Sequence, residues 1–359
     1  MARKRVLITG GAGFIGSHLA DELLAHGYRV RVLDSLAPRS HGDHRARPGY
    51  LATDVELLRG DIRDRRAVER ALRRVDAVFH LAPESSSLND FGTAVLLESL
   101  TRRPVEKLVF ASSLDVYGEG LYRTPDGRIV EAPARTVAQL EAGRWDPTGA
   151  QGEPLEPIPI PETAPPAAGS VAALAKFDQE RLCLMVGGAY RIPTVVLRLF
   201  SVYGPRQGLR DPDGVLATFA AALLESEAPV VFEDGLQQRD FVNVHDVVRA
   251  CRLALESSAA AGKVFNVASG SSLTIRTVAA QMADALGRRE LRPQITGRYR
   301  VEDVRHCLAD TTLAAKALGY EARISFTEGL LELAEWLARQ RESRVVGTAA
   351  RLEAQGPGG

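Results

Sequence analysis

The sequence has few cysteines and no run of apolar residues long enough to cross a bilayer. Its three cysteines, Cys183, Cys251 and Cys307, lie far apart in a chain of 359 residues and form no pair at metal-ligand spacing. So few cysteines exclude the disulfide framework of small secreted domains. We therefore expect a reducing, cytoplasmic setting and no metal site.

The sequence also lacks an excess of charge of either sign. Its 45 basic and 45 acidic residues balance, which gives no electrostatic reason to expect a nucleic acid or an anionic membrane as partner. The apolar run in "RKRVLITGG" is too short for the core of a signal peptide. We expect a small-molecule substrate, no nucleic acid and no membrane.

What the sequence does have is a regular alternation of strand-like and helix-like segments. Residues 5–10, 14–27 and 28–34 read as strand, helix and strand, and the runs "DAVFHLA", "KLVFASS" and "PTVVLRLF" follow as further strands. This order predicts an α/β fold, a Rossmann doubly wound parallel sheet with helices on both faces. The chain is longer than one usual domain, so we expect a smaller C-terminal α+β substrate domain as well.

The predicted domains follow from these segments. We expect a dinucleotide-binding domain over residues 1–190, and the last sheet elements with the substrate domain over residues 191–345. Residues 122–166 contain nine prolines, which oppose a regular helix or a central strand. This segment reads as a lid over the site or as a passive surface loop, and residues 346–359 read as a disordered tail.

The turn after the first strand carries the glycines of a dinucleotide site. "TGGAGFIG" spaces Gly10, Gly13 and Gly16 where the chain must turn sharply and let a pyrophosphate approach the amides of a helix N-terminus. Phe14 and Ile15 belong to the same predicted contact. The alternative is that these glycines serve only packing.

Acidic residues at the next strand ends are candidates for the adenosine half of the cofactor. Asp34 ends the second strand, where a carboxylate can hold the ribose hydroxyls of NAD. Arg39 follows closely and could pair with a 2′-phosphate, so NAD(H) and NADP(H) both remain open. Asp61 in "RGDIRD" is a candidate for the adenine amino group. Three further residues complete the predicted cofactor contacts: Ile62, Leu81 and Ala82.

Taken together, these motifs resemble the extended short-chain dehydrogenase/reductase superfamily, in particular its nucleotide-sugar epimerase and dehydratase branch. The resemblance covers residues 5–340. The matching stretches are "TGGAGFIGSHLADELLAHGYRVRVLD", "GDIRD", "VFHLA", "LVFASSLDVYG", "LRLFSVYGPRQ", "QQRDFVNVHDVVRA", "FNVASGSSLTI" and "DVRHCLADTTLAAKALGY". The resemblance implies that a Ser or Thr, and the Tyr and Lys of a Y-x-x-x-K helix, act on a carbonyl or alcohol beside the nicotinamide.

Carried over to this sequence, the catalytic set is incomplete. The serine is Ser113, with Ser112 beside it, and the lysine is Lys176, which would also hold the nicotinamide ribose. The position of the tyrosine is occupied by Ala172. A hydride delivered to a ketone leaves an alkoxide that needs a proton donor or strong stabilisation, and alanine supplies neither.

At other positions, some residues match the family and others differ from it. Arg239 and Arg300 match arginines that clamp the diphosphate of a sugar nucleotide, although each could be a surface ion-pair residue. Ser201 stands where sugar-nucleotide enzymes typically carry Asn, and the segment between "HLAP" and "NDFG" is short. Tyr117 and Tyr203 could be displaced proton donors or core residues. The predicted substrate contacts are Ser113, Tyr117, Ser201, Tyr203 and Arg239.

These losses leave several functions open. The main hypothesis is an NAD(P)H-dependent ketoreductase of an aromatic polyketide, because a phenol beside the ketone can protonate the alkoxide without an enzyme tyrosine. The pattern of losses resembles that of an atypical angucyclinone ketoreductase. The alternatives are a nucleotide-sugar 4-epimerase or dehydratase, an inactivated form of such an enzyme, and a non-catalytic cofactor-binding protein. Helices near residues 91–100 and 172–184 could pair in a homodimer, as in many relatives.

Overall fold

The computed structural model describes residues 3–41, 46–82, 89–208, 214–301 and 303–354. Its centre is a seven-stranded sheet in which every pairing is parallel. Its strands, in spatial order, are β13 (Val264–Val267), β9 (Thr194–Leu199), β5 (Lys107–Ser113), β4 (Ala77–His80), β1 (Arg5–Thr9), β2 (Arg29–Asp34) and β3 (Glu56–Arg59). The strand order reverses direction between β1 and β4, which is where a doubly wound sheet opens a ligand crevice.

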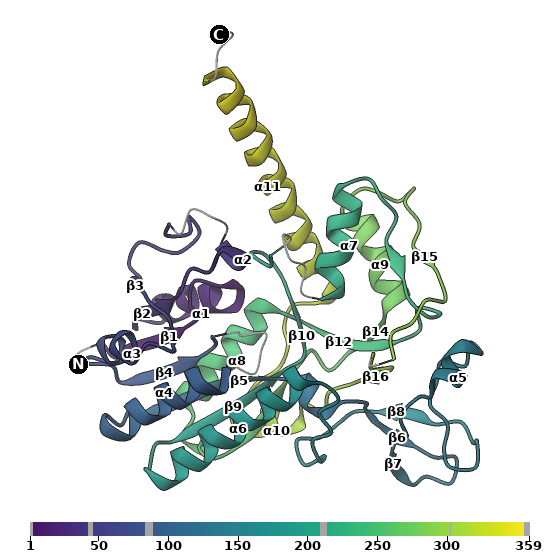
Figure 1. Cartoon of the computed structure of the whole chain (residues 1–359), viewed down its shortest axis with the longest axis horizontal. Coiled ribbons are helices and arrows are strands. Elements are labelled where there is room, and N and C mark those ends of the chain that lie inside the picture. The colour runs from purple at the N-terminus through teal and green to yellow at the C-terminus, as the bar shows by residue number, and fades with distance from the viewer. Residues whose placement is uncertain (1–2, 42–45, 83–88, 209–213, 302, 355–359) are drawn as a thin grey trace.

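Helices cover both faces of this sheet (Figure 1). On one face α1 (Phe14–Ala25) packs against α8 (Val244–Glu256), and on the other α4 (Asn89–Arg102) packs against α3 (Arg65–Ala71) and α6 (Val171–Ala189). Two apolar clusters fill the two interfaces. The central strands are buried on both sides, as their continuous apolar runs require. The doubly wound fold predicted from the sequence is confirmed.

A smaller C-terminal part stands beside the carboxyl ends of the strands (Figure 1). Its sheet runs β10 (Ser201–Tyr203), β12 (Gln238–Asn243), β14 (Ser272–Thr274), with β16 (His306–Cys307) paired to β12. The remaining elements of this part are α7 (Val215–Leu224), β11 (Val230–Val231), α9 (Ile275–Ala285), β15 (Gln294–Ile295) and α11 (Phe326–Ala354), whereas η2 (Ser258–Ala260) and α10 (Thr312–Leu318) pack against the large sheet. Side chains of α7, α9 and α11 form a third apolar core. The smaller C-terminal domain expected from the sequence is present.

The proline-rich segment is more ordered than a loop. It forms a three-stranded antiparallel sheet of β6 (Leu121–Arg123), β7 (Ile129–Glu131) and β8 (Glu156–Ile158), with the short helix α5 (Val137–Glu141). Pro157 lies in β8, an edge strand, where a missing amide hydrogen is tolerated. The segment lies next to the C-terminal sheet (Figure 1). We call residues 121–166 the insert.

Buried ion pairs fix the insert to the C-terminal part. The guanidinium of Arg135 lies 2.7 Å from a carboxylate oxygen of Glu233. Arg305 bonds the other Glu233 oxygen at 2.9 Å, Asp234 at 2.7 Å and Asp146 of the insert at 2.7 Å. The side chains of Arg135, Glu233 and Arg305 are almost completely buried. An insert that moves as a lid would have to break these pairs, so the lid remains a prediction.

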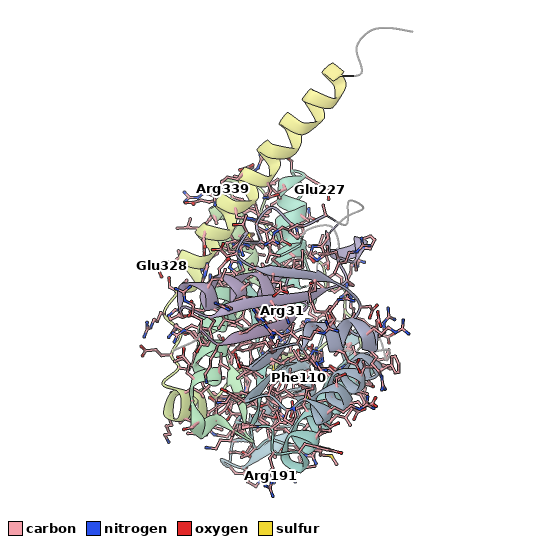
Figure 2. The ribbon with its side chains drawn as sticks, turned by 90° about the vertical axis from the view of Figure 1, so that its left-hand side faces the viewer. Arg31, Phe110, Arg191, Glu227, Glu328 and Arg339 are labelled. Atoms are coloured by element: carbon pink, nitrogen blue, oxygen red, sulfur yellow. The ribbon has the colours of Figure 1, made fainter. Side chains whose placement is uncertain are left out.

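The end of the chain differs from the expected disordered tail. α11 continues to Ala354, so residues 346–354 are helical, while residues 355–359 lie outside the described part. Good helix formers such as Ala, Arg, Leu and Glu in "AARLEA" account for the continuation. Figure 2 shows α11 leaving the body of the molecule beyond Arg339. Among the described residues, no helix is both long and apolar enough to span a membrane.

Candidate active site

The glycine turn brings β1 and α1 against the end of β4. Gly10 has φ of +69°, and a Cβ placed there would lie 2.7 Å from the Cα of Ala82. A Cβ on Gly16 would meet the Gly10 carbonyl oxygen, and a Cβ on Gly13 would lie 3.3 Å from it. The turn therefore has no room for side chains, and the amides at the start of α1 stay open to a pyrophosphate. Phe14 and Ile15 follow in the first turn of α1, and both are partly buried.

Asp34 is fixed beside this turn by backbone hydrogen bonds. The amide of Ala12 donates to one carboxylate oxygen at 2.9 Å, and the amide of Leu36 donates to the other at 2.9 Å. The His41 ring lies 3.6 Å from the same carboxylate. A fixed carboxylate at the end of β2 fits the ribose hydroxyls of NAD and repels a 2′-phosphate. The side chain of Arg39 lies outside the described residues.

The other predicted cofactor residues line the neighbouring strand ends. Asp61 accepts hydrogen bonds from the Arg63 guanidinium at 2.6 and 2.9 Å, and these bonds lower the pKa of its carboxyl group. Ile62 is largely buried against Gly92 of α4. Leu81 and Ala82 are half-buried after β4. Contact between Asp61 and an adenine amino group therefore remains a prediction, since Arg63 already occupies that carboxylate.

Ser113 and Lys176 lie on neighbouring elements at the reacting end of the crevice. Ser113 ends β5, and α6, which carries Lys176, packs against both β5 and the turn η1 (Leu114–Tyr117). The Lys176 ammonium lies 5.1 Å from the ring centroid of Phe110 in β5. Ala172 is exposed in the first turn of α6, four residues before Lys176 and thus on the same helix face. Ser113 and Lys176 thus provide the expected serine and lysine, whereas the position of the tyrosine carries only the methyl group of Ala172.

The sequence did not single out Asp115, which contacts Ser113 directly. The Ser113 hydroxyl donates to an Asp115 carboxylate oxygen at 2.8 Å, and the Asp115 amide donates to the Ser113 oxygen at 3.3 Å. Asp115 is exposed in η1. The only sequence signal is its place two residues after the serine, which is the spacing of a side chain–backbone turn and carries no catalytic meaning by itself.

A buried histidine also borders the lysine. His80 contacts the hydroxyls of Thr9 at 2.8 Å and Thr93 at 3.0 Å. Burial, and secondarily the charge of Lys176, lowers the pKa of His80 to about 3. The ring is therefore neutral near pH 7 and holds the floor of the crevice without adding charge beside Lys176.

The tyrosines considered as displaced proton donors are engaged elsewhere. Tyr117 is buried, and its hydroxyl donates to the Asn266 side chain at 2.7 Å. Burial raises the pKa of Tyr117 to about 12. Tyr203 lies in the C-terminal core with its hydroxyl donating to the Phe326 carbonyl at 3.2 Å, and burial raises its pKa as well. These contacts favour the packing interpretation for both.

The residues predicted on the substrate side lie in the C-terminal part. Arg239, in β12, donates to the carbonyl of Arg305 at 2.9 Å and also to that of Val304. Arg300 is exposed, with its guanidinium 5.0 Å from the ring centroid of Phe232. Ser201 is half-buried in β10, which pairs with β12. Arg239 is thus held in place by main-chain oxygens, whereas Arg300 presents its charge to solvent.

Comparison with known proteins agrees with this geometry. The sequence profile of the NAD dependent epimerase/dehydratase family matches residues 6–139 and 148–268. The chain belongs to this family. The unmatched residues 140–147 lie in the insert and include Asp146. The matching family is NAD dependent, and a UDP-glucose 4-epimerase structure from Thermus thermophilus contains NAD, so the cofactor is NAD rather than NADP. The fixed carboxylate of Asp34 is compatible with this cofactor.

Nucleotide-sugar enzymes are among the relatives over almost the whole chain. A dTDP-L-rhamnose 4-epimerase of Burkholderia thailandensis is 32% identical over 95% of this chain and 97% of its own length. A UDP-glucose 4-epimerase of Mycolicibacterium smegmatis is 30% identical, with 94% and 100% covered. The structure of UDP-glucose 4-epimerase from Thermotoga maritima with UDP-glucose aligns with a TM-score of 0.76 at 30% identity, covering 94% and 99%.

Proposed function

We propose that this protein is an NAD-dependent 4-epimerase of a nucleoside-diphosphate hexose. The observation that carries the proposal is that the chain keeps both arginines of the predicted diphosphate clamp, Arg239 in β12 and Arg300 exposed in the C-terminal part, beside a Rossmann sheet whose Asp34 fits NAD. Two arginines suit the two phosphates of a sugar nucleotide because the guanidinium fork matches phosphate oxygens. Relatives that act on dTDP- and UDP-linked sugars support the same substrate class.

The residues of the chain take separate roles in this proposal. NAD, when bound, supplies the acceptor and later the donor of a hydride. The glycine turn and Asp34 hold its pyrophosphate and adenosine ribose, and Lys176 holds the nicotinamide ribose. Ser113 contacts the reacting oxygen, and Arg239 with Arg300 anchors the substrate. Holding the reacting groups in one geometry is a large part of the rate gain for hydride transfer.

A second function is favoured by one specific observation, the exposed Ala172 at the tyrosine position. A ketoreductase acting on an aromatic polyketide would need no enzyme tyrosine if a phenol beside the ketone supplied the proton. Lys176 can hold the nicotinamide ribose in that reaction as well. The two functions differ in their cofactor balance, because a reductase consumes NADH and an epimerase does not.

The cofactor balance provides the test. The protein is incubated with NAD and a panel of dTDP- and UDP-hexoses, and separately with hydroxylated aromatic ketones and NADH deuterated at the transferred position. We expect inversion at C4 of a nucleotide sugar, followed by NMR, without net NADH formation. Deuterium appearing in a polyketide alcohol with no sugar inversion would instead establish the reductase.

A matched pair of arginines tests the substrate class. Arg300→Ala should raise KM for the nucleotide sugar about tenfold or more, because a charge-assisted contact is worth about 1.5–3 kcal/mol. Arg298→Ala is the control, since Arg298 contacts the same Phe232 ring at 5.2 Å but is not at the predicted clamp position. Equal effects of the two variants would argue against a diphosphate clamp at Arg300.

A further inference from the structure

The crevice lacks the family tyrosine, so oxidation of a sugar hydroxyl needs another group to take its proton. An alcohol is a very weak acid. Its oxidation to a ketone removes a hydride from the carbon and a proton from the hydroxyl oxygen, so a group must accept that proton. The nearby His80 is buried with both ring nitrogens engaged by hydroxyl groups. The carboxylate in contact with Ser113 is that of Asp115.

The hydrogen bonds of Ser113 leave it a single free position. A serine hydroxyl has one donor and two acceptor sites. Its donor is used on the Asp115 carboxylate at 2.8 Å, and one acceptor site receives the Asp115 amide at 3.3 Å. The remaining site can only accept. Ser113 is therefore set to receive the O–H of an alcohol, whereas a ketone would require it to donate.

The turn η1, which carries Asp115, is held against two neighbouring parts of the chain. The chain segment leading into α6 is tied to η1, because the Ala167 amide donates to the Val116 carbonyl at 2.9 Å. On the other side, Val116 and Tyr117 of η1 pack in one apolar cluster with Cys307 of β16, and β16 pairs with β12, the strand of Arg239. The turn that carries Asp115 thus lies between the segment leading into the helix with the open tyrosine position and the strand that holds Arg239.

We propose that Asp115 accepts, through Ser113, the proton that the substrate hydroxyl releases on oxidation. The inference rests on the proposed function, because it assigns the missing base of that reaction. The electron pair of the C–H bond leaves as a hydride to bound NAD. The hydroxyl proton passes to the Ser113 oxygen while the Ser113 proton passes to Asp115, so the products are a ketone, a reduced cofactor and a protonated carboxyl group.

The return step uses the same atoms in reverse. With Asp115 protonated, its O–H donates to the Ser113 oxygen, and Ser113 can then donate to the ketone. Hydride return to the opposite face of the ketone draws the proton back through Ser113 to the new alkoxide. The alcohol is inverted, Asp115 is again a carboxylate, and no external acid or base is consumed.

The test compares two aspartates that each accept a hydrogen bond from a hydroxyl two residues earlier. Asp115→Asn removes the proton acceptor with almost no change in size, and kcat for sugar inversion should fall about 10²- to 10⁴-fold. Asp126→Asn is the matched control, because Asp126 also accepts from a hydroxyl two residues earlier, that of Thr124, in the insert. The control should keep the wild-type kcat.

Further readouts separate a proton acceptor from a structural residue. In Asp115→Asn, the melting temperature and the dissociation constants for NAD and the nucleotide sugar should match those of the wild type. Added formate or acetate should restore part of the kcat of Asp115→Ala, and Asp115→Glu should retain more activity than Asp115→Asn. A structural role predicts no rescue by small carboxylates.

Each contrary outcome has one meaning. Wild-type protein that inverts a nucleotide sugar while Asp115→Asn keeps the same kcat overturns the relay and leaves the proposed function standing. Loss of melting temperature or of ligand binding in proportion to lost activity, without carboxylate rescue, also overturns the relay. Wild-type protein that inverts no nucleotide sugar overturns the relay together with the proposed function.

Discussion

Ala172 replaces the side chain that the rest of the site is arranged to orient. The helix that carries it begins normally, because the Ser170 hydroxyl accepts from the Ala173 amide at 3.1 Å and caps α6. Lys176 lies in α6 and Ser113 ends β5, and these two elements pack against each other. The substitution therefore removes a reactive group without disturbing the elements that would position it.

This arrangement predicts a gain of activity on restoring the phenol. Ala172→Tyr should raise kcat for sugar inversion by about ten- to a hundredfold, because a positioned acid–base group would then act beside Lys176. It should also reduce the penalty of Asp115→Asn, since the proton would have a second path. The measurement is kcat of the single and double variants.

The control for this variant is the neighbouring position. Val171→Tyr adds the same side chain to an exposed residue of the same helix turn but on a different face. It should leave kcat unchanged. An Ala172→Tyr variant that binds NAD normally and gains nothing would mean that proton transfer does not limit the reaction.

At the scale of elements, the insert is held by buried charges as well as by the apolar packing of Ile160 and Ala164. Arg305 is fully buried, and Glu233 bonds both Arg305 and Arg135. Burial opposes the charge of the Arg305 guanidinium, but the hydrogen bonds and charges of Asp234 and Asp146 outweigh it and raise the pKa of Arg305. Removing one of the buried members, Arg135, Glu233 or Arg305, would leave a charge unpaired in a low dielectric.

We therefore expect Glu233→Gln to lower the free energy of unfolding by about 3–5 kcal/mol, the usual result of removing one partner of a buried pair. Glu156→Gln is the control, because Glu156 pairs with Arg123 at 3.7 Å on the surface of the same insert. That change should cost less than about 1 kcal/mol. Urea unfolding measures both, and equal losses would show that the buried cluster contributes no more than a surface pair.

At the scale of the whole molecule, local patterns in the sequence predicted the secondary structure and the cofactor turn. They did not predict the ion pairs between residues that are far apart in the chain. The alternation of strands and helices, the glycine turn and Asp34 follow from short patterns in the chain. The ion cluster joins Arg135 and Asp146 to Glu233 and Arg305, about which local pattern says nothing. Asp115 was missed for another reason, since its role depends on a hydrogen bond and on Ala172 being small.

The surface of the α4–α6 pair leads to an assembly prediction. Phe91, Leu174 and Met185 are 52–64% exposed on these two helices, which pack against each other. We propose that a second copy of the chain covers this apolar face. Light scattering should give twice the chain mass of 38.8 kDa, and Met185→Glu should shift the protein toward the monomer. A wild-type monomer at assay concentration would contradict the proposal.

The guanidinium of Arg239 rests on the carbonyls of Val304 and Arg305, and Arg305 is also the centre of the cluster that holds the insert. The insert and Arg239 therefore depend on the same residue, Arg305, and would have to be exchanged together between related proteins. A chimera that received residues 121–166 without Glu233, Asp234 and Arg305 would leave Arg135 and Asp146 of the insert without their partners. Exchanged together with these three residues and Arg239, the insert would carry the backbone support of that arginine into the new enzyme.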